Sequence, residues 1–178
     1  MAEAVQPPER PKPESGSGER EARRVGESSS LLVRWMSITD ANSAGFIHGG
    51  TVMRLVDEAA GLAAIKHSGR RVVTAGIDRM TFNTPVFVGE LLRCTASVNA
   101  VWRTSMEVGV RVEAENPFTG EARHTSTAYL TMVALDEGRP VPAPRLIAET
   151  DDEKRRRREA ELRRANRLAE REQILGGR

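Results

Sequence analysis

Residues 40–60 read Asp-Ala-Asn-Ser-Ala-Gly-Phe-Ile-His-Gly-Gly-Thr-Val-Met-Arg-Leu-Val-Asp-Glu-Ala-Ala. The short polar residues and the glycine at the start are typical of a loop, and a helix is predicted to begin near His48 or Gly49. This helix is apolar nearly all round except at Asp57 and Glu58, so we expect it to be buried. A carboxylate on a buried helix needs a partner or a chemical role. Asp57 is therefore a candidate site residue, together with the helix start at Gly49 and Gly50.

The segments around this helix predict an antiparallel sheet. The helix is expected to end before Ser68 and Gly69, and the predicted strands cover residues 31–36, 71–82, 92–102, 106–114 and 121–135. Apolar and polar residues alternate along 92–102 and 106–114, which indicates strands with one face on the core and one face in solvent. One long helix with such a sheet predicts an α+β fold. A broad sheet covered by a single helix leaves edges, so we expect self-association through an edge strand.

The chain of 178 residues divides into three predicted parts. Residues 1–30 form a disordered N-terminal tail, because residues 1–27 are mostly Pro, Glu, Arg, Gly and Ser without apolar periodicity. Residues 31–148 form the folded domain, and residues 149–178 form a charged C-terminal helix or tail. Because no apolar run is long enough and residues 1–27 contain no apolar segment, we expect neither a membrane span nor a secretory signal. Cys94 is the single cysteine, which excludes an internal disulfide and favours a small buried side chain in a cytoplasmic protein.

The basic residues are concentrated near the C-terminus, although the net charge is only +2. Residues 151–172 contain nine basic and seven acidic side chains in mixed order, with Leu162, Ala165 and Leu168 at helical spacing. This pattern predicts a salt-bridged structural helix with a thin apolar seam. RNA binding is the weaker alternative, because no aromatic residues are interleaved with the arginines. We expect neither a nucleic acid nor a membrane as a partner.

Five segments in register resemble acyl-CoA thioesterases of the hotdog superfamily, above all the brain-type acyl-CoA hydrolases and their short bacterial relatives. The matching segments are Asn42-Ser-Ala-Gly-Phe-Ile-His-Gly-Gly with Met53 and Asp57-Glu-Ala-Ala, Met80-Thr-Phe-Asn-Thr-Pro-Val with Val88-Gly-Glu, Arg103-Thr-Ser-Met-Glu-Val, Tyr129-Leu-Thr-Met-Val-Ala-Leu-Asp, and Arg139-Pro-Val-Pro. The similarity spans about residues 31–148. A pair of glycines before a helix is a weak signal alone, but the five segments together are specific.

The resemblance implies a hotdog fold, in which the antiparallel sheet wraps the central helix. It also implies homodimers assembled into hexamers, with active sites at the dimer interface. Asn42 and Asp57 match the catalytic positions of the family, and each site is expected to take one of them from each subunit. The implied reaction is the hydrolysis of acyl-CoA, with medium to long acyl chains, to free fatty acid and CoA. No separate cofactor and no metal are expected, because CoA is part of the substrate and a product.

The residues suggest how this reaction would proceed. Asp57 would deprotonate water or, alternatively, attack the thioester itself to form an anhydride. The N–H groups of Gly49 and Gly50, expected to be unpaired at the helix start, would stabilise the oxyanion. Asn42 would orient the attacking water through its amide.

Each of these residues also has a purely structural interpretation. Asp57 would instead pair with Arg54 or Arg79, Asn42 would only shape the loop, and His48 is expected to cap or pack at the helix start rather than act as a base.

The phosphates of CoA need basic and hydroxyl groups at the subunit edge. We expect these from Arg103, Thr104 and Ser105 at a hairpin turn, with Asn83 and Arg79 behind them. The acyl chain would run between the helix and the sheet, past residues 53, 56 and 60. A non-catalytic acyl-CoA-binding or regulatory hotdog protein is the alternative function, and a hotdog dehydratase is disfavoured because no His has a paired carboxylate.

Overall fold

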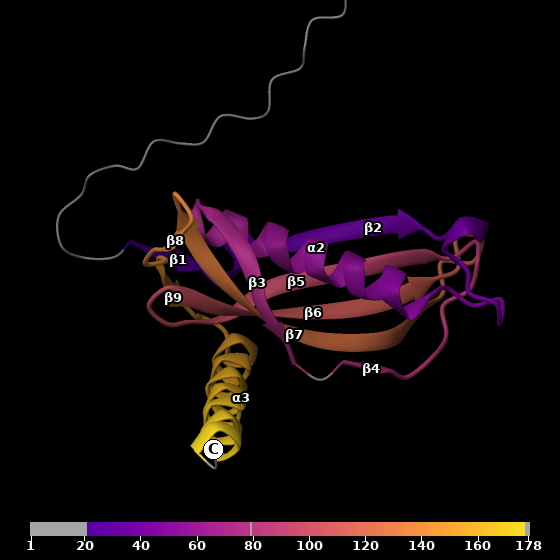
Figure 1. The fold of residues 1–178 in the computed structure, drawn as a ribbon. Coiled ribbons are helices and arrows are strands. Elements are labelled where there is room, and N and C mark those ends of the chain that lie inside the picture. Colours follow the sequence, from indigo (N-terminus) through magenta and orange to yellow (C-terminus); the bar gives the residue numbers. More distant parts are fainter. Residues whose placement is uncertain (1–20, 79, 177–178) are drawn as a thin grey trace, which may run out of the picture.

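The computed structural model describes residues 21–78 and 80–176, which form a curled antiparallel sheet around one long helix (Figure 1). The main sheet contains β2 (Ser30–Trp35), β3 (Arg71–Ile77), β4 (Thr81–Phe82), β5 (Leu91–Val101), β6 (Ser105–Glu115), β7 (Ala122–Asp136) and β8 (Arg139–Pro140). Its strand order is β2-β5-β6-β7-β3, with every pair antiparallel, and β4 and β8 each pair with β7. The predicted α+β architecture is confirmed, but the strand predicted over 71–82 is divided into β3 and β4.

The central helix, α2 (Gly49–Ser68), begins where the sequence predicts and ends one residue later than predicted, at Ser68. His48 caps its start, since Nδ1 of the imidazole accepts a hydrogen bond from the Gly50 N–H at 3.1 Å. Gly69 ends it with a left-handed φ of 64°, and its N–H donates to the Ile65 carbonyl at 2.8 Å. Glycine adopts this conformation without steric cost, which explains the sharp stop.

The prediction that α2 is buried on all sides is wrong for the single chain. Its face toward the sheet is fully buried and consists of small and apolar residues, including Val56, Ala60 and Ala64. Its other face leaves Leu62 and Ile65 exposed. The sheet curls around only one side of the helix (Figure 1). The apolar side chains on its other side therefore stay exposed.

The alternation predicted for β5 and β6 is confirmed on the inner face, where Cys94, Val98 and Val108 are buried against α2. On the outer face the expectation of solvent exposure is wrong at two positions, since Asn99 is 2% exposed and Glu107 is 0% exposed. The cause is α3 (Asp151–Gly176), which crosses the outer face of the sheet and covers both residues. The charged C-terminal helix was predicted, but its docking site was not.

The N-terminal tail predicted over residues 1–30 is wrong for its last part. Residues 22–24 form β1 (Ala22–Arg24), which pairs in parallel with β9 (Arg145–Ile147), and α1 (Val25–Ser28) follows. The pairing partner lies more than a hundred residues away, so local composition gives no sign of it. Residues 1–20, which also belong to this prediction, lie outside the described residues. A short 3-10 helix, η1 (Ile38–Asp40), connects β2 to the loop before α2.

Candidate active site

Asp57 lies in the middle of α2 and is only partly exposed. One of its carboxylate oxygens, Oδ1, accepts a hydrogen bond from Oγ1 of Thr74 on β3 at 2.5 Å. The register of β3 against β7 shifts between Thr74 and Gly76, which is typical of a β-bulge and re-aims nearby side chains. Thr74 was not among the residues predicted from the sequence. Its role depends on the pairing of β3 beside α2, which no local pattern near residue 74 indicates.

The structural alternative for Asp57 was an ion pair with an arginine. Arg54 instead pairs with Glu58, one turn along the same face of α2, at 3.1 Å. Arg79, the other predicted partner, lies outside the described residues. Within residues 21–78 and 80–176, Thr74 is the hydrogen-bond partner of the Asp57 side chain, so Oδ2 makes no bond to a described residue.

The start of α2 supplies one backbone donor rather than the predicted two. The N–H of Gly50 is already bonded to the imidazole of His48, so the expectation that it is unpaired is wrong. The N–H of Gly49 has no bond to any described residue. The capping role expected for His48 is confirmed, and it leaves Gly49 as the free donor at the positive end of the helix dipole.

A cavity of about 310 Å³ opens beside Gly49. It lies between the first turn of α2 and the segment that follows β4, and its lining includes Val52, Phe82, Asn83 and the buried Ser126. The Phe82 ring is the nearest neighbour to the open side of Gly49, since a Cβ added there would lie 3.5 Å from it. The cavity therefore places apolar walls and a few polar groups at the free donor.

Asn42 precedes α2 in a loop that it helps to shape. Its Oδ1 accepts hydrogen bonds from the N–H groups of Ala44 at 2.9 Å and Phe46 at 3.2 Å. The loop-shaping role is thus real for the amide oxygen, whereas the amide NH₂ has no bond to a described residue and can donate elsewhere. No contact joins Asn42 to Asp57 within one chain. Asp57 lies eight residues beyond Gly49, about 12 Å along the helix axis.

The predicted CoA-binding residues fall at two separate places. Asn83 lines the cavity, and its N–H donates to the Thr125 carbonyl at 2.9 Å. Arg103 and Thr104 form the β5–β6 turn, and Ser105 begins β6, at the other end of the sheet. Their carbonyls accept from Ala143, Ala134 and Trp102, each at 2.9–3.0 Å. One chain therefore does not bring this turn to the cavity, and Arg79 lies outside the described residues.

Other reactive groups do not belong to this site. Burial raises the pKa of the Cys94 thiol to about 12, so the thiol stays protonated, as expected for a packing residue. Across residues 21–78 and 80–176 no group of three or more His, Cys, Asp and Glu side chains is arranged to hold a metal ion. In the same residues, neither long helix is apolar enough to cross a membrane.

Comparison with known proteins gives consistent matches. The family model of the Thioesterase superfamily matches residues 44–120. A Bacillus subtilis (strain 168) protein named "Uncharacterized acyl-CoA thioester hydrolase YkhA" is 36% identical over 134 residues, which cover 75% of this chain and 78% of that one. The crystal structure of an apo-hexameric acyl-CoA thioesterase has a TM-score of 0.81 and 40% identity, and the match covers 84% of this chain and 97% of that chain.

The structures of the acyl-CoA hydrolase from Staphylococcus aureus allow a comparison at individual residues. Its complex with coenzyme A has a TM-score of 0.79 and 32% identity, covering 88% of this chain and 96% of that chain. Three of its structures carry an alanine in place of an asparagine, an aspartate or a threonine. In that chain the aspartate follows the asparagine by 15 positions, and the threonine follows the aspartate by 17 positions. Asn42, Asp57 and Thr74 follow one another here at the same two intervals.

Proposed function

The chain belongs to the thioesterase superfamily, and on this premise we propose that it hydrolyses acyl-CoA to free fatty acid and CoA, with Asp57 as the general base. The observation that carries the proposal is the Thr74–Asp57 hydrogen bond. It joins two residues whose spacing, together with that of Asn42, matches the three residues replaced in the Staphylococcus aureus hydrolase. Thr74 thus holds one oxygen of the carboxylate and leaves the other to act on a water molecule.

In the proposed reaction, Asp57 Oδ2 takes a proton from water as the water oxygen attacks the thioester carbon. The carbonyl oxygen becomes an oxyanion, which the N–H of Gly49 stabilises at the start of α2. One such donor contributes about 3 kcal/mol to lowering the barrier in comparable sites. The tetrahedral intermediate then breaks its C–S bond, and the CoA thiolate receives the proton from Asp57. Direct attack by Asp57 to form an anhydride is the alternative route, with the same residues in place.

The second part of the site is proposed to come from a neighbouring subunit. The open face of α2 and the edge strand β3 expose apolar side chains side by side, among them Met53, Leu62, Val73 and Ile77. Such a patch is typical of a protein–protein interface, and β3 has a free edge for pairing. A homodimer across this face would bring Asn42 of one subunit toward Asp57 of the other. Three such dimers would give a hexamer, the assembly named for the similar apo-hexameric thioesterase.

In this arrangement the substrate would span both subunits. The acyl chain would enter the cavity beside Gly49, where Val52 and Phe82 supply apolar walls. Asn83 would contact the pantetheine end, and the turn at Arg103, with Thr104 and Ser105, would hold the CoA phosphates of a site shared with the neighbouring subunit. We place the protein in the cytoplasm, in keeping with a single buried cysteine.

The test is thiol release from acyl-CoAs of graded chain length by the purified full chain. We expect release by the wild-type chain and a loss of at least a hundredfold in kcat for Asp57→Asn, which keeps the shape but removes the base. Unchanged turnover in this variant would refute the assigned role. Tight CoA binding measured by calorimetry without any thiol release would instead select the non-catalytic acyl-CoA-binding protein.

A further inference from the structure

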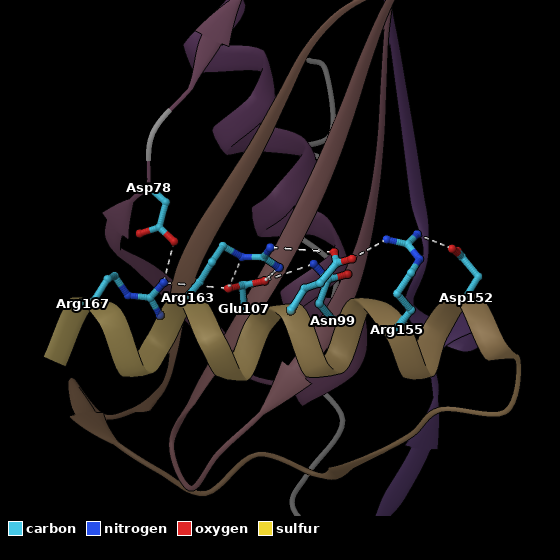
Figure 2. Close-up of polar contacts among 8 residues, drawn as sticks. Asp78, Asn99, Glu107, Asp152, Arg155, Arg163 and Arg167 are labelled. Carbon is cyan, nitrogen blue, oxygen red and sulfur yellow. Dashed lines mark hydrogen bonds and ion pairs between the residues drawn. The ribbon is translucent and has the colours of Figure 1, made fainter. Parts of the chain in front are cut away.

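Glu107 on β6 is a fully buried carboxylate that the proposed mechanism does not use. Its neighbours Met106 and Val108 belong to the core, and the side chain of Glu107 meets α3 on the outer face instead. A buried carboxylate is costly unless it is paired and hydrogen-bonded. Glu107 accepts from Asn99 Nδ2 at 3.2 Å and from Arg163 Nε and Nη2 at 3.2 and 2.7 Å (Figure 2).

These contacts fix the position of α3 on the sheet. The Arg163 guanidinium also lies 3.6 Å from the centroid of the Tyr129 ring, so it contacts β6 and β7 together. Gly109 leaves the space that Asn99 occupies, because a Cβ at Gly109 would lie 2.6 Å from Asn99 Nδ2. α3 is thus anchored by the Arg163–Glu107 ion pair. The carboxylate of this pair is completely buried, so the guanidinium must keep one orientation to hydrogen-bond both of its oxygens.

Arg167, one turn after Arg163, extends this network to the edge of the sheet. Its Nη1 lies 3.8 Å from Glu107 Oε2 and 2.5 Å from Asp78 Oδ2 (Figure 2). Residues four apart share one face of a helix, so a helix anchored by Arg163 presents Arg167 in a defined place. Asp78 directly follows β3, and its own N–H donates to the Tyr129 carbonyl at 2.8 Å.

Asp78 lies four residues after Thr74 and four before Phe82, so it stands between two parts of the candidate site. Among the described strands, β3 lies at the edge of the sheet and pairs with β7 alone, with an irregular register beside Thr74. The end of β3 is held by backbone pairing on one side only, through Ile77 with Leu130 and through the Asp78 N–H with the Tyr129 carbonyl. An ion pair from a firmly docked helix adds a side-chain constraint at Asp78, the residue that follows the strand.

We propose that Arg167 is a positioning residue of the active site: by holding Asp78 it sets the end of β3, so that Thr74 reaches Asp57. The proposal rests on the proposed hydrolase function. It gives the C-terminal helix a role in the rate of the reaction, although no residue of that helix touches the reacting atoms.

The experiment compares Arg167→Gln, Asp78→Asn and the double variant in full-length protein, with kcat and KM measured on one acyl-CoA. We expect each single variant to lower kcat roughly tenfold with a smaller change in KM, as a displaced catalytic group does. The double variant should be no slower than either single one, because both remove the same contact. In a Thr74→Val background, Arg167→Gln should have little further effect. In the otherwise wild-type chain, Arg167→Lys keeps the positive charge and should have a higher kcat than Arg167→Gln. Arg157→Gln is the matched control, since among the described residues Arg157 forms its ion pair with Glu161 on the same helix.

The outcomes separate this proposal from the function on which it rests. A wild-type chain that releases no CoA overturns both. An active wild type with Arg167→Gln and Asp78→Asn within twofold of it overturns the positioning role alone. The positioning role is also overturned if the loss of kcat in Arg167→Gln multiplies with the loss in Thr74→Val. An equal loss in Arg157→Gln overturns it as well. If Arg167→Gln lowers the melting temperature, Asp78→Asn decides the question, because it leaves the contacts of both Arg163 and Arg167 with Glu107 in place.

Discussion

Asp57 has two carboxylate oxygens in different surroundings, one bonded to Thr74 and one without a bond to a described residue. In the proposed mechanism, the first would fix the orientation of the carboxylate and the second would act on water. A hydrogen bond to a charged group contributes about 2 kcal/mol, which corresponds to roughly thirtyfold in rate if the bond is needed in the transition state. We therefore expect Thr74→Val to lower kcat by about this factor. Thr74→Ser, which keeps the hydroxyl, should remain close to wild type, and equal rates for Val and Ser would exclude the role.

Cys94 gives a prediction about the assay itself. The thiol is fully buried and burial raises its pKa to about 12, so almost no thiolate exists at pH 8. We expect the folded protein to show no reaction with a chromogenic disulfide reagent at this pH, and one thiol per chain to react in denaturant. Rapid labelling of the native protein would show that the region around β5 opens. It would also add a background to thiol-release measurements.

At the level of residues, the sequence located part of the candidate site. Asp57, Gly49 and the capping role of His48 follow from the composition of one continuous segment. Thr74 could not be found in this way, because its contact joins an edge strand to a helix 17 residues earlier. The loss of Gly50 as a donor depends on the rotamer of His48, which composition does not indicate.

His67, in the last turn of α2, connects three elements. Its Nδ1 lies 3.4 Å from the hydroxyl of Ser28 at the end of α1, and Nε2 lies 3.1 Å from the carbonyl of Pro144 just before β9. Burial lowers the pKa of this imidazole from its ordinary value of 6.5. Between the folded pKa and 6.5 the unfolded chain binds more protons, so the free energy of unfolding falls as the pH drops through this window.

We expect the urea midpoint of the wild-type chain to decrease between pH 7.5 and 5.5 more than that of His67→Gln. The substitution removes the titrating group, so the remaining pH dependence comes from other residues. His124→Gln, at a partly exposed position on β7, is the control and should retain the wild-type slope. Identical slopes for wild type and His67→Gln would show that His67 does not couple protonation to folding.

At the level of elements, periodicity predicted α2 and the long strands because each is locally consistent. It could not predict that polar residues such as Asn99 and Glu107 are buried, since an alternating strand gives the same pattern whether its polar face meets water or a charged helix. Nor could it predict β1, whose backbone partners come from β9 at the other end of the domain. Both errors arise from contacts between segments far apart in the sequence.

For the whole molecule, the main prediction is that each site needs two chains. One chain leaves Asn42 in the loop before α2 and Asp57 halfway along the helix, beside exposed apolar residues of α2 and β3. If the two side chains act together, Asn42→Ala and Asp57→Ala should each abolish activity in homo-oligomers. A mixed dimer, however, has one site with both residues intact and one with neither. Random pairing gives half mixed dimers, so co-expression of the two variants should restore about a quarter of the wild-type activity.

The control for this experiment is co-expression of Asp57→Ala with Asp57→Asn, which can produce no intact site and should stay inactive. A difference between the two mixtures would show that Asn42 and Asp57 meet across a subunit interface, whatever the size of the full assembly. Absence of recovery, with mixed oligomers demonstrated by mass spectrometry, would place both residues in the same chain's site. That result would conflict with the separation along α2 and would require the loop of Asn42 to fold back over the helix.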